Sequence, residues 1–202
     1  MSNILKFPQR APAKFGLRRA RRRQTPDNPD QLDLFSRSGK VLKLPTGLSP
    51  FEEALVIDEA GDLGEAKGMY GKAIEEGDCV ADAYCNLGVL QSQTGERDDA
   101  FDSFRSALIH DQRHWESHYN LGNLYFDGEE YRPARLHYEL AAGIEPSFRN
   151  TFFNLGLLFA IDAEYPAAID MLNRYRELTP GEEGVAADDL LETLRRSAAP
   201  QG

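Results

Sequence analysis

The sequence contains very little cysteine and no long apolar stretch. Only Cys79 and Cys85 occur among 202 residues. Two cysteines fit reduced thiols in a cytoplasm better than a disulfide framework. No stretch approaches the roughly 18 consecutive apolar residues of a transmembrane helix. We therefore expect a cytoplasmic protein that does not enter a membrane.

Acidic residues are absent from the first 26 residues, which hold eight Lys or Arg. Since the whole chain carries a net charge of −10, residues 27–202 carry −18. A basic arm on an acidic body suggests that the arm has its own task. This N-terminus lacks the apolar run of about 7–15 residues in a secretory signal. Its Arg-rich character leaves an organellar transit peptide open, although it is poor in serine.

Residues 1–46 are predicted to be a disordered tail, because polar residues dominate and prolines recur along them. The prolines are Pro8, Pro12, Pro26, Pro29 and Pro45. One short helix over Lys14–Gln24 is the exception that the sequence allows, since Leu17 and Ala20 lie among helix-forming arginines.

A triplet of Asn, Leu and Gly returns every 34 residues, beginning at Asn86, Asn120 and Asn154. A fixed period of this length, with apolar residues at helical spacing, predicts an array of helical repeats. The predicted boundaries are 47–80 for a degenerate first repeat and then 81–114, 115–148 and 149–182. An amphipathic capping helix is predicted at 183–197, with its apolar side formed by Val185, Leu190, Leu191 and Leu194.

These repeats resemble the tetratricopeptide repeat (TPR) family over about three quarters of the chain. The fourth residue of each good repeat is Tyr84, His118 or Phe152, and the Leu-Gly pair follows. The resemblance implies an all-α, right-handed solenoid of helical hairpins, with about four repeats and a cap. Gly88, Gly122 and Gly156 are expected where a facing helix comes close. Turns are expected around Gly95, around Gly128 and at Asp162-Ala163.

In the TPR family a second face of the first helices lines a concave groove that takes ligands. Mapped here, the peptide-binding groove comprises Asn86, Val89, Tyr119, Asn120, Asn123, Phe126, Asn154 and Leu157. Asparagine is a poor residue inside helices, so its regular return needs a reason. Its amide both donates and accepts, which suits clamping a peptide backbone. Two alternatives stay open: the asparagines bond the neighbouring repeat, and Phe153 and Leu157 are packing residues.

The predicted groove is apolar and acidic, and its face carries no Lys or Arg in repeats two to four. It should prefer ligands with apolar anchors and positive charge, and reject acidic tails. No catalytic constellation can be assembled from the sequence. His110, His114 and His118 cross a helix boundary, so we expect no metal site. We therefore predict a non-catalytic adaptor for protein partners, without a cofactor.

The basic arm contains Arg18, Arg19, Arg21, Arg22 and Arg23. Three interpretations remain: contact with nucleic-acid phosphates, folding back onto the acidic body, and a merely solubilising role. The first supports an alternative function, a nucleic-acid-associated regulator whose repeats recruit partners.

A linear motif at Gln31, Leu32, Asp33, Leu34 and Phe35 resembles the segment by which bacterial proteins dock on the DNA-polymerase sliding clamp. The three apolar side chains would fill a pocket while the Gln31 amide bonds its rim. The resemblance implies an adaptor tethered to the clamp. The alternatives are docking of the same side chains on the first repeat, and no role.

Overall fold

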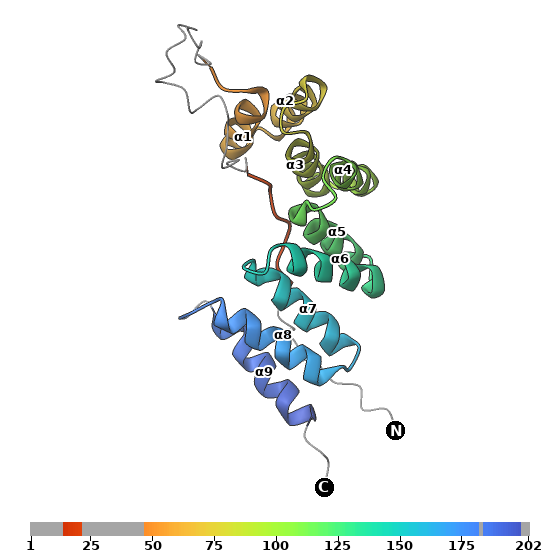
Figure 1. Cartoon of the computed structure of the whole chain (residues 1–202), viewed down its shortest axis with the longest axis vertical. Coiled ribbons are helices and arrows are strands. Elements are labelled where there is room, and N and C mark those ends of the chain that lie inside the picture. Colours follow the sequence, from red (N-terminus) through yellow and green to blue (C-terminus); the bar gives the residue numbers. More distant parts are fainter. Residues whose placement is uncertain (1–13, 22–46, 182–183, 199–202) are drawn as a thin grey trace, which may run out of the picture. The chain divides into compact units, whose positions relative to one another are not determined.

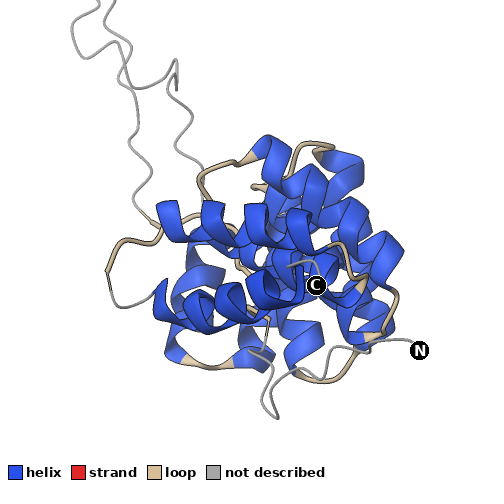
Figure 2. Cartoon of the chain, turned by 90° about the horizontal axis from the view of Figure 1, so that it is seen from below, coloured by secondary structure: helices blue, strands red, loops and turns tan. Residues whose placement is uncertain are grey.

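The computed structural model describes residues 14–21, 47–181 and 184–198, and every regular element in them is a helix (Figure 2). The described residues between 19 and 111 form one compact unit, called here the N-terminal unit. The described residues among 1–18 and 112–202 form a second, the C-terminal unit. The helices of the N-terminal unit are α1 (Pro50–Ala60), α2 (Leu63–Glu76), α3 (Val80–Gln93) and α4 (Arg97–His110). Those of the C-terminal unit are α5 (Trp115–Asp127), α6 (Tyr131–Ile144), α7 (Arg149–Ile161), α8 (Tyr165–Glu177) and α9 (Val185–Ala198).

The N-terminal unit consists of two helical hairpins, α1 with α2 and α3 with α4, and α2 packs on α3. Its first helix has a complete capping box. The Ser49 side chain accepts from the Glu52 N–H, and the Glu52 carboxylate accepts from the Ser49 N–H. Gly61 ends this helix in the left-handed conformation. Phe51 and Tyr70 are fully buried in the core between these helices.

The C-terminal unit consists of the hairpins α5–α6 and α7–α8, followed by α9 against α8 (Figure 1). Its core joins side chains of all these helices, among them Tyr119, Tyr138, Phe153, Leu172 and Leu194. Each is at most 1% exposed. The residues that recur with the 34-residue period thus form the contacts between successive helices.

Three recurring glycines lie where the second helix of each hairpin comes close, as predicted. A Cβ atom on Gly122 would stand 2.6 Å from the Tyr138 ring. On Gly88 it would stand 2.8 Å from the Phe104 ring. Real Cβ atoms do not approach other atoms so closely, so the hairpins require a residue without a side chain here.

The predicted apolar side of the capping helix is correct for its three leucines and wrong for Val185. Leu190, Leu191 and Leu194 are at most 4% exposed, whereas Val185 is 53% exposed. Helical residues turn by about 100° each, so Val185 lies opposite Leu194. Ala187, which is fully buried, takes the core position at the start of α9.

The turns lie where they were predicted, and in the turn around Gly128 the left-handed residue is Glu129. That glycine has an ordinary φ of −87°, and Glu129 follows it with φ 59°. Ala163 also has φ 59°, while Gly95 has φ 84°. These three positions are one period apart, so the fold requires a left-handed residue here even where the sequence does not supply glycine.

Replacing Ala163 by glycine is expected to stabilise the protein. The left-handed conformation costs a residue with a Cβ about 1–2 kcal/mol, and the extra chain entropy of glycine offsets part of the gain. We expect the free energy of unfolding to rise by about 0.5–1 kcal/mol, measured by urea titration. Ala167→Gly, inside α8, is the control and should lower it by about 1 kcal/mol. A loss of stability in Ala163→Gly would contradict this account.

Residues 14–21 are extended and form no helix, so the short helix allowed over Lys14–Gln24 is not formed in its described part. Ala20 is completely buried, and Phe15 packs against the core of the C-terminal unit. Residues 1–13 and 22–46, on which most of the predicted tail falls, lie outside the described residues.

Candidate functional site

Two asparagines of the C-terminal unit hold the backbone of the extended segment. Asn154 on α7 accepts from the Phe15 N–H at 2.9 Å and donates to the Phe15 carbonyl at 3.2 Å. Asn120 on α5 makes the same pair of bonds to Arg18, both at 2.7 Å. Each amide thus satisfies both polar backbone groups of one residue. Such a contact does not depend on the side chain of the residue that is held.

The N-terminal unit repeats this contact on α3. Asn86 accepts from the Ala20 N–H at 2.7 Å and donates to the Ala20 carbonyl at 3.0 Å. Both residues are completely buried. The asparagine that recurs with the period therefore makes the same two-bond contact in both units.

Two further side chains on α5 donate hydrogen bonds to the backbone of the segment, at Phe15 and Gly16. The Tyr119 hydroxyl donates to the Phe15 carbonyl at 3.1 Å, and the Asn123 amide donates to the Gly16 carbonyl at 3.2 Å. The Tyr138 hydroxyl donates to the Asn123 Oδ1 at 2.8 Å, which leaves the amide NH2 directed to the segment. We call Tyr119, Asn120, Asn123 and Asn154 the asparagine face of the C-terminal unit.

The tyrosine hydroxyls around these amides remain donors at physiological pH. Burial raises the pKa of Tyr119 and of Tyr138 above the ordinary range of the phenol. Burial, followed by the nearby Asp58 carboxylate, raises the pKa of Tyr70 in the same direction. These hydroxyls are therefore protonated, and they donate to Asp58, to the Phe15 carbonyl and to Asn123.

Phe15 is the apolar anchor of the segment. Its ring meets the Phe153 ring edge-on, with centroids 5.0 Å apart, and lies 5.7 Å from the Tyr175 ring. Both partners are nearly fully buried. Burial of a phenyl ring is among the larger apolar contributions that one side chain makes to binding.

Basic side chains of the segment contact acidic and aromatic groups of the C-terminal unit. The Lys14 ammonium pairs with the Asp127 carboxylate at 3.2 Å and lies 5.8 Å from the Phe126 ring centroid. The Arg18 guanidinium lies 5.6 Å from the Phe148 ring centroid. Cations are attracted to the faces of aromatic rings, so these contacts add charge selectivity to the backbone clamps.

In the N-terminal unit the Arg19 guanidinium pairs with the Asp58 carboxylate, with 2.6 Å between Nε and Oδ2. Asp58 is only 5% exposed and also accepts from the Tyr70 hydroxyl at 3.1 Å. Tyr70 in turn accepts from the Asn86 amide at 3.2 Å. A buried carboxylate needs such partners, and loss of one leaves an uncompensated charge. The arginine and the clamp are therefore linked through one chain of polar contacts.

The structure buries nearly all the residues predicted for the groove. Asn86, Tyr119, Asn120, Asn123 and Asn154 bond the segment, and Phe126 lies beside Lys14. Leu157 belongs to the core of its unit, and Val89 is 1% exposed. Of the basic arm, Arg18, Arg19 and Arg21 are described, whereas Arg22, Arg23 and the motif Gln31–Phe35 lie outside the described residues.

Three residues at the site were not predicted from the sequence: Phe15, Asp58 and Tyr138. Tyr70 and Tyr138 occupy the same place in their repeats, where Phe104 and Leu172 also stand. The signal that could have identified Tyr138 is that this position carries a tyrosine hydroxyl in only two of the four repeats. No periodic signal marks Phe15, since it lies in the tail.

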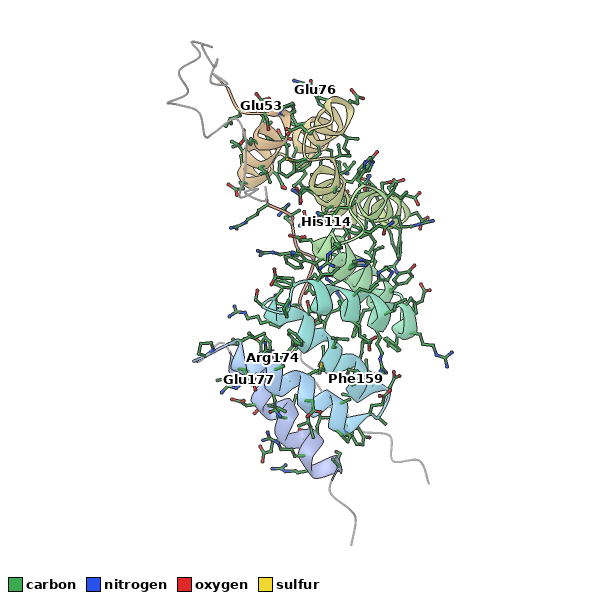
Figure 3. All side chains as sticks on the ribbon, viewed as in Figure 1. Glu53, Glu76, His114, Phe159, Arg174 and Glu177 are labelled. Carbon is green, nitrogen blue, oxygen red and sulfur yellow. The ribbon has the colours of Figure 1, made fainter. Side chains whose placement is uncertain are left out.

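The four histidines have structural contacts of their own. His114 caps α5, where its Nδ1 accepts from the Ser117 N–H at 3.2 Å (labelled in Figure 3). His118 and His137 face each other with their Nδ1 atoms 3.1 Å apart. His110 stacks on Tyr84. In the described ranges, no three His, Cys, Asp or Glu side chains gather where they could hold a metal.

Protonation of His137 is expected to destabilise the folded chain. Burial, followed by the nearby His118, lowers the pKa of His137 from 6.5 to about 4. The unfolded chain then binds more protons between these values, so stability falls as pH drops from about 6.5 towards 4. Allowing for partial exposure, we expect a loss of about 1–2 kcal/mol by pH 4.5. In urea titrations, the His137→Gln variant should lose less unfolding free energy between neutral pH and pH 4.5 than the unmodified chain does. Equal losses in the two chains would refute the role of His137 protonation.

A family model described as tetratricopeptide repeat matches residues 81–108 and 116–148. These two segments are tetratricopeptide repeats. They cover α3–α4 and α5–α6, the hairpins that carry Asn86 and Asn120. No curated protein matches the chain.

Solved structures of TPR proteins are similar to the chain at low sequence identity. One is PilF of Pseudomonas aeruginosa, with TM-score 0.64, 24% identity, and coverage of 73% of this chain and 68% of that one. A tetratricopeptide repeat protein of Parabacteroides merdae has TM-score 0.62, 21% identity, and coverage of 73% and 59%. The first TPR of Spaghetti (RPAP3), bound to the HSP90 peptide SRMEEVD, has TM-score 0.54, 19% identity, and coverage of 58% and 91%.

These similarities confirm the predicted fold class, an all-α TPR fold. None of the described helices has the length and apolar character that crossing a membrane requires.

Proposed function

We propose that this protein is a non-catalytic, cytoplasmic adaptor that binds an extended peptide segment of a protein partner. The observation that carries this proposal is the two-bond contact that Asn86, Asn120 and Asn154 each make with a peptide backbone. A surface of this kind recognises an extended chain without a particular side chain at the clamped residue. TPR repeats support protein binding in general.

The side chains around the asparagine face select among extended peptides. Phe153 and Tyr175 receive an aromatic ring, while Asp127 receives a cation. In the N-terminal unit, Asp58 receives an arginine. The preferred partner segment is therefore basic with an aromatic anchor.

The adaptor function is tested by affinity purification from cells of the source organism. The bait is the full chain, and the comparison is Asn120→Ala/Phe126→Ala, which removes one clamp and one aromatic contact. Partners should be lost while the thermal unfolding temperature stays within a few degrees of the original. Unchanged partners with unchanged stability would refute this assignment.

An acidic peptide is expected to bind poorly. The peptide SRMEEVD, present in the similar Spaghetti structure, carries three acidic side chains, whereas this surface offers the carboxylates of Asp58 and Asp127. Like charges juxtaposed at an interface are costly. In fluorescence polarisation with the full chain, the Kd of SRMEEVD should be at least about tenfold above the Kd of a peptide of residues 12–23 of this chain. Equal binding would contradict the proposed charge preference.

Tethering to a sliding clamp through Gln31, Leu34 and Phe35 is the finer part of this proposal, and it rests on the sequence motif alone. A peptide spanning Asp27–Lys40 should bind the sliding clamp of the source organism with Kd below about 100 μM. Replacement of the three residues by alanine should abolish this binding. Binding that survives the replacement would end the idea.

A further inference from the structure

The surface proposed to bind a partner is already occupied by the chain itself. Phe15 and Arg18 fill the clamps of the C-terminal unit, and Ala20 fills the clamp of the N-terminal unit. Phe15 also covers Phe153 and Tyr175, which would otherwise receive the aromatic anchor of a partner. Figure 1 draws residues 14–21 as the dark red segment. A partner peptide cannot reach these groups while the segment is bound.

We propose that residues 14–21 are an intramolecular competitor, and that the partner is a basic segment with the same pattern that displaces them. This inference rests on the proposed function. The segment reads Lys-Phe-Gly-Leu-Arg-Arg-Ala-Arg, and its contacts define the pattern. For the C-terminal unit a partner needs an aromatic residue at the place of Phe15. For the N-terminal unit it needs an arginine at the place of Arg19 and a small residue at the place of Ala20.

The contacts explain why each part of this pattern is required. The aromatic ring meets two buried rings, and the arginine neutralises a buried carboxylate. Ala20 is 0% exposed, so a larger side chain there would collide with its surroundings. Gly16 and Arg21 are exposed, and a Cβ on Gly16 would meet nothing within 4 Å. These two places accept other residues.

Competition by a segment of the same chain lowers affinity by a calculable amount. A tethered ligand acts at an effective concentration on the order of millimolar. If the free segment binds with Kd of about 100 μM, the surface is open roughly one tenth of the time. The apparent Kd of an external peptide then rises about tenfold.

The test compares three full-length chains with a fluorescent peptide of residues 12–23 as the probe. The released variant, Phe15→Ala/Ala20→Glu, removes the anchor and places a charge at the buried position. The control, Gly16→Ala/Arg21→Glu, introduces the same two residues, alanine and glutamate, at exposed places of the segment. The released variant should bind about tenfold more tightly than the unmodified chain, and the control within about twofold of it. Equal affinities for all three would overturn the competition.

Failure of the proposed function gives a different result. If the surface binds no peptide, the released variant will show no polarisation change, whereas failed competition leaves all three chains binding equally. A probe in which alanine replaces Phe15 should bind the released variant at least about tenfold more weakly. Equal binding by that probe would overturn the aromatic requirement.

Amide exchange in the unmodified chain gives a second measurement that needs no variant. The Phe15 and Arg18 amides donate to asparagine oxygens, so they should exchange slowly and become fast when unlabelled peptide saturates the surface. Protection that persists at saturation would overturn displacement. Protection that disappears on dilution, together with dissociation of a dimer in sedimentation, would overturn the intramolecular assignment.

Discussion

Replacing Asn120 by alanine in the released variant is expected to weaken binding of the residue 12–23 peptide by on the order of a hundredfold. The substitution removes both hydrogen bonds that the Asn120 amide makes to the Arg18 backbone. Two such losses together cost about 2–3 kcal/mol. Fluorescence polarisation measures the change directly.

The fold should tolerate this change, because alanine is a better helix residue than asparagine by about 0.6 kcal/mol. Asn173→Ala is the matched control. It makes the same chemical change on α8, where Asn173 bonds the exposed side chain of Arg195. The control should bind the peptide as the released variant does. Retained affinity in Asn120→Ala would show that the amide does not clamp a backbone.

A methyl group on Gly122 is expected to cause a large loss of stability in the C-terminal unit. The new Cβ would stand 2.6 Å from the Tyr138 ring. That ring is completely buried and its hydroxyl is bonded to Asn123, so it cannot move away freely. Overpacking of this kind costs about 1–3 kcal/mol, and we expect Gly122→Ala to fall near the upper end.

Urea titration of Gly122→Ala is compared with that of Gly143→Ala. Gly143 lies on α6 of the same hairpin, is exposed, and a Cβ there would meet nothing within 4 Å. Alanine at this helical position should stabilise by up to about 1 kcal/mol. Two variants of equal stability would mean that the hairpin relaxes around the added methyl.

The helices were predictable because their signal is local and repeated. Residues 47–80, predicted as a degenerate first repeat, contain the helices α1 (Pro50–Ala60) and α2 (Leu63–Glu76). Proline, glycine and apolar spacing act within one or two turns, so a single sequence reveals them. The period then reveals which glycines meet a facing helix, since a contact that recurs needs the same residue each time.

The asparagines were identifiable as unusual for the same reason, since an unfavourable helix residue that recurs indicates a shared role. The sequence did not decide between a peptide backbone and a neighbouring repeat as their partner. Asn154 contacts both kinds of partner. It bonds the Phe15 backbone of the segment, and its amide lies 3.2 Å from the hydroxyl of Tyr138 in the neighbouring repeat. Which groups surround an amide depends on residues distant along the chain.

The sequence by itself determined that this protein is an array of helical hairpins, with a periodic asparagine on each first helix of the later repeats and a basic segment before them. Only the tertiary structure showed that residues 14–21 fill the clamps, that Phe15 is the anchor and that Asp58 receives Arg19. The physical reason is separation along the chain. Local sequence sets helix bounds, whereas contacts between residues more than 30 apart depend on how the folded helices place them.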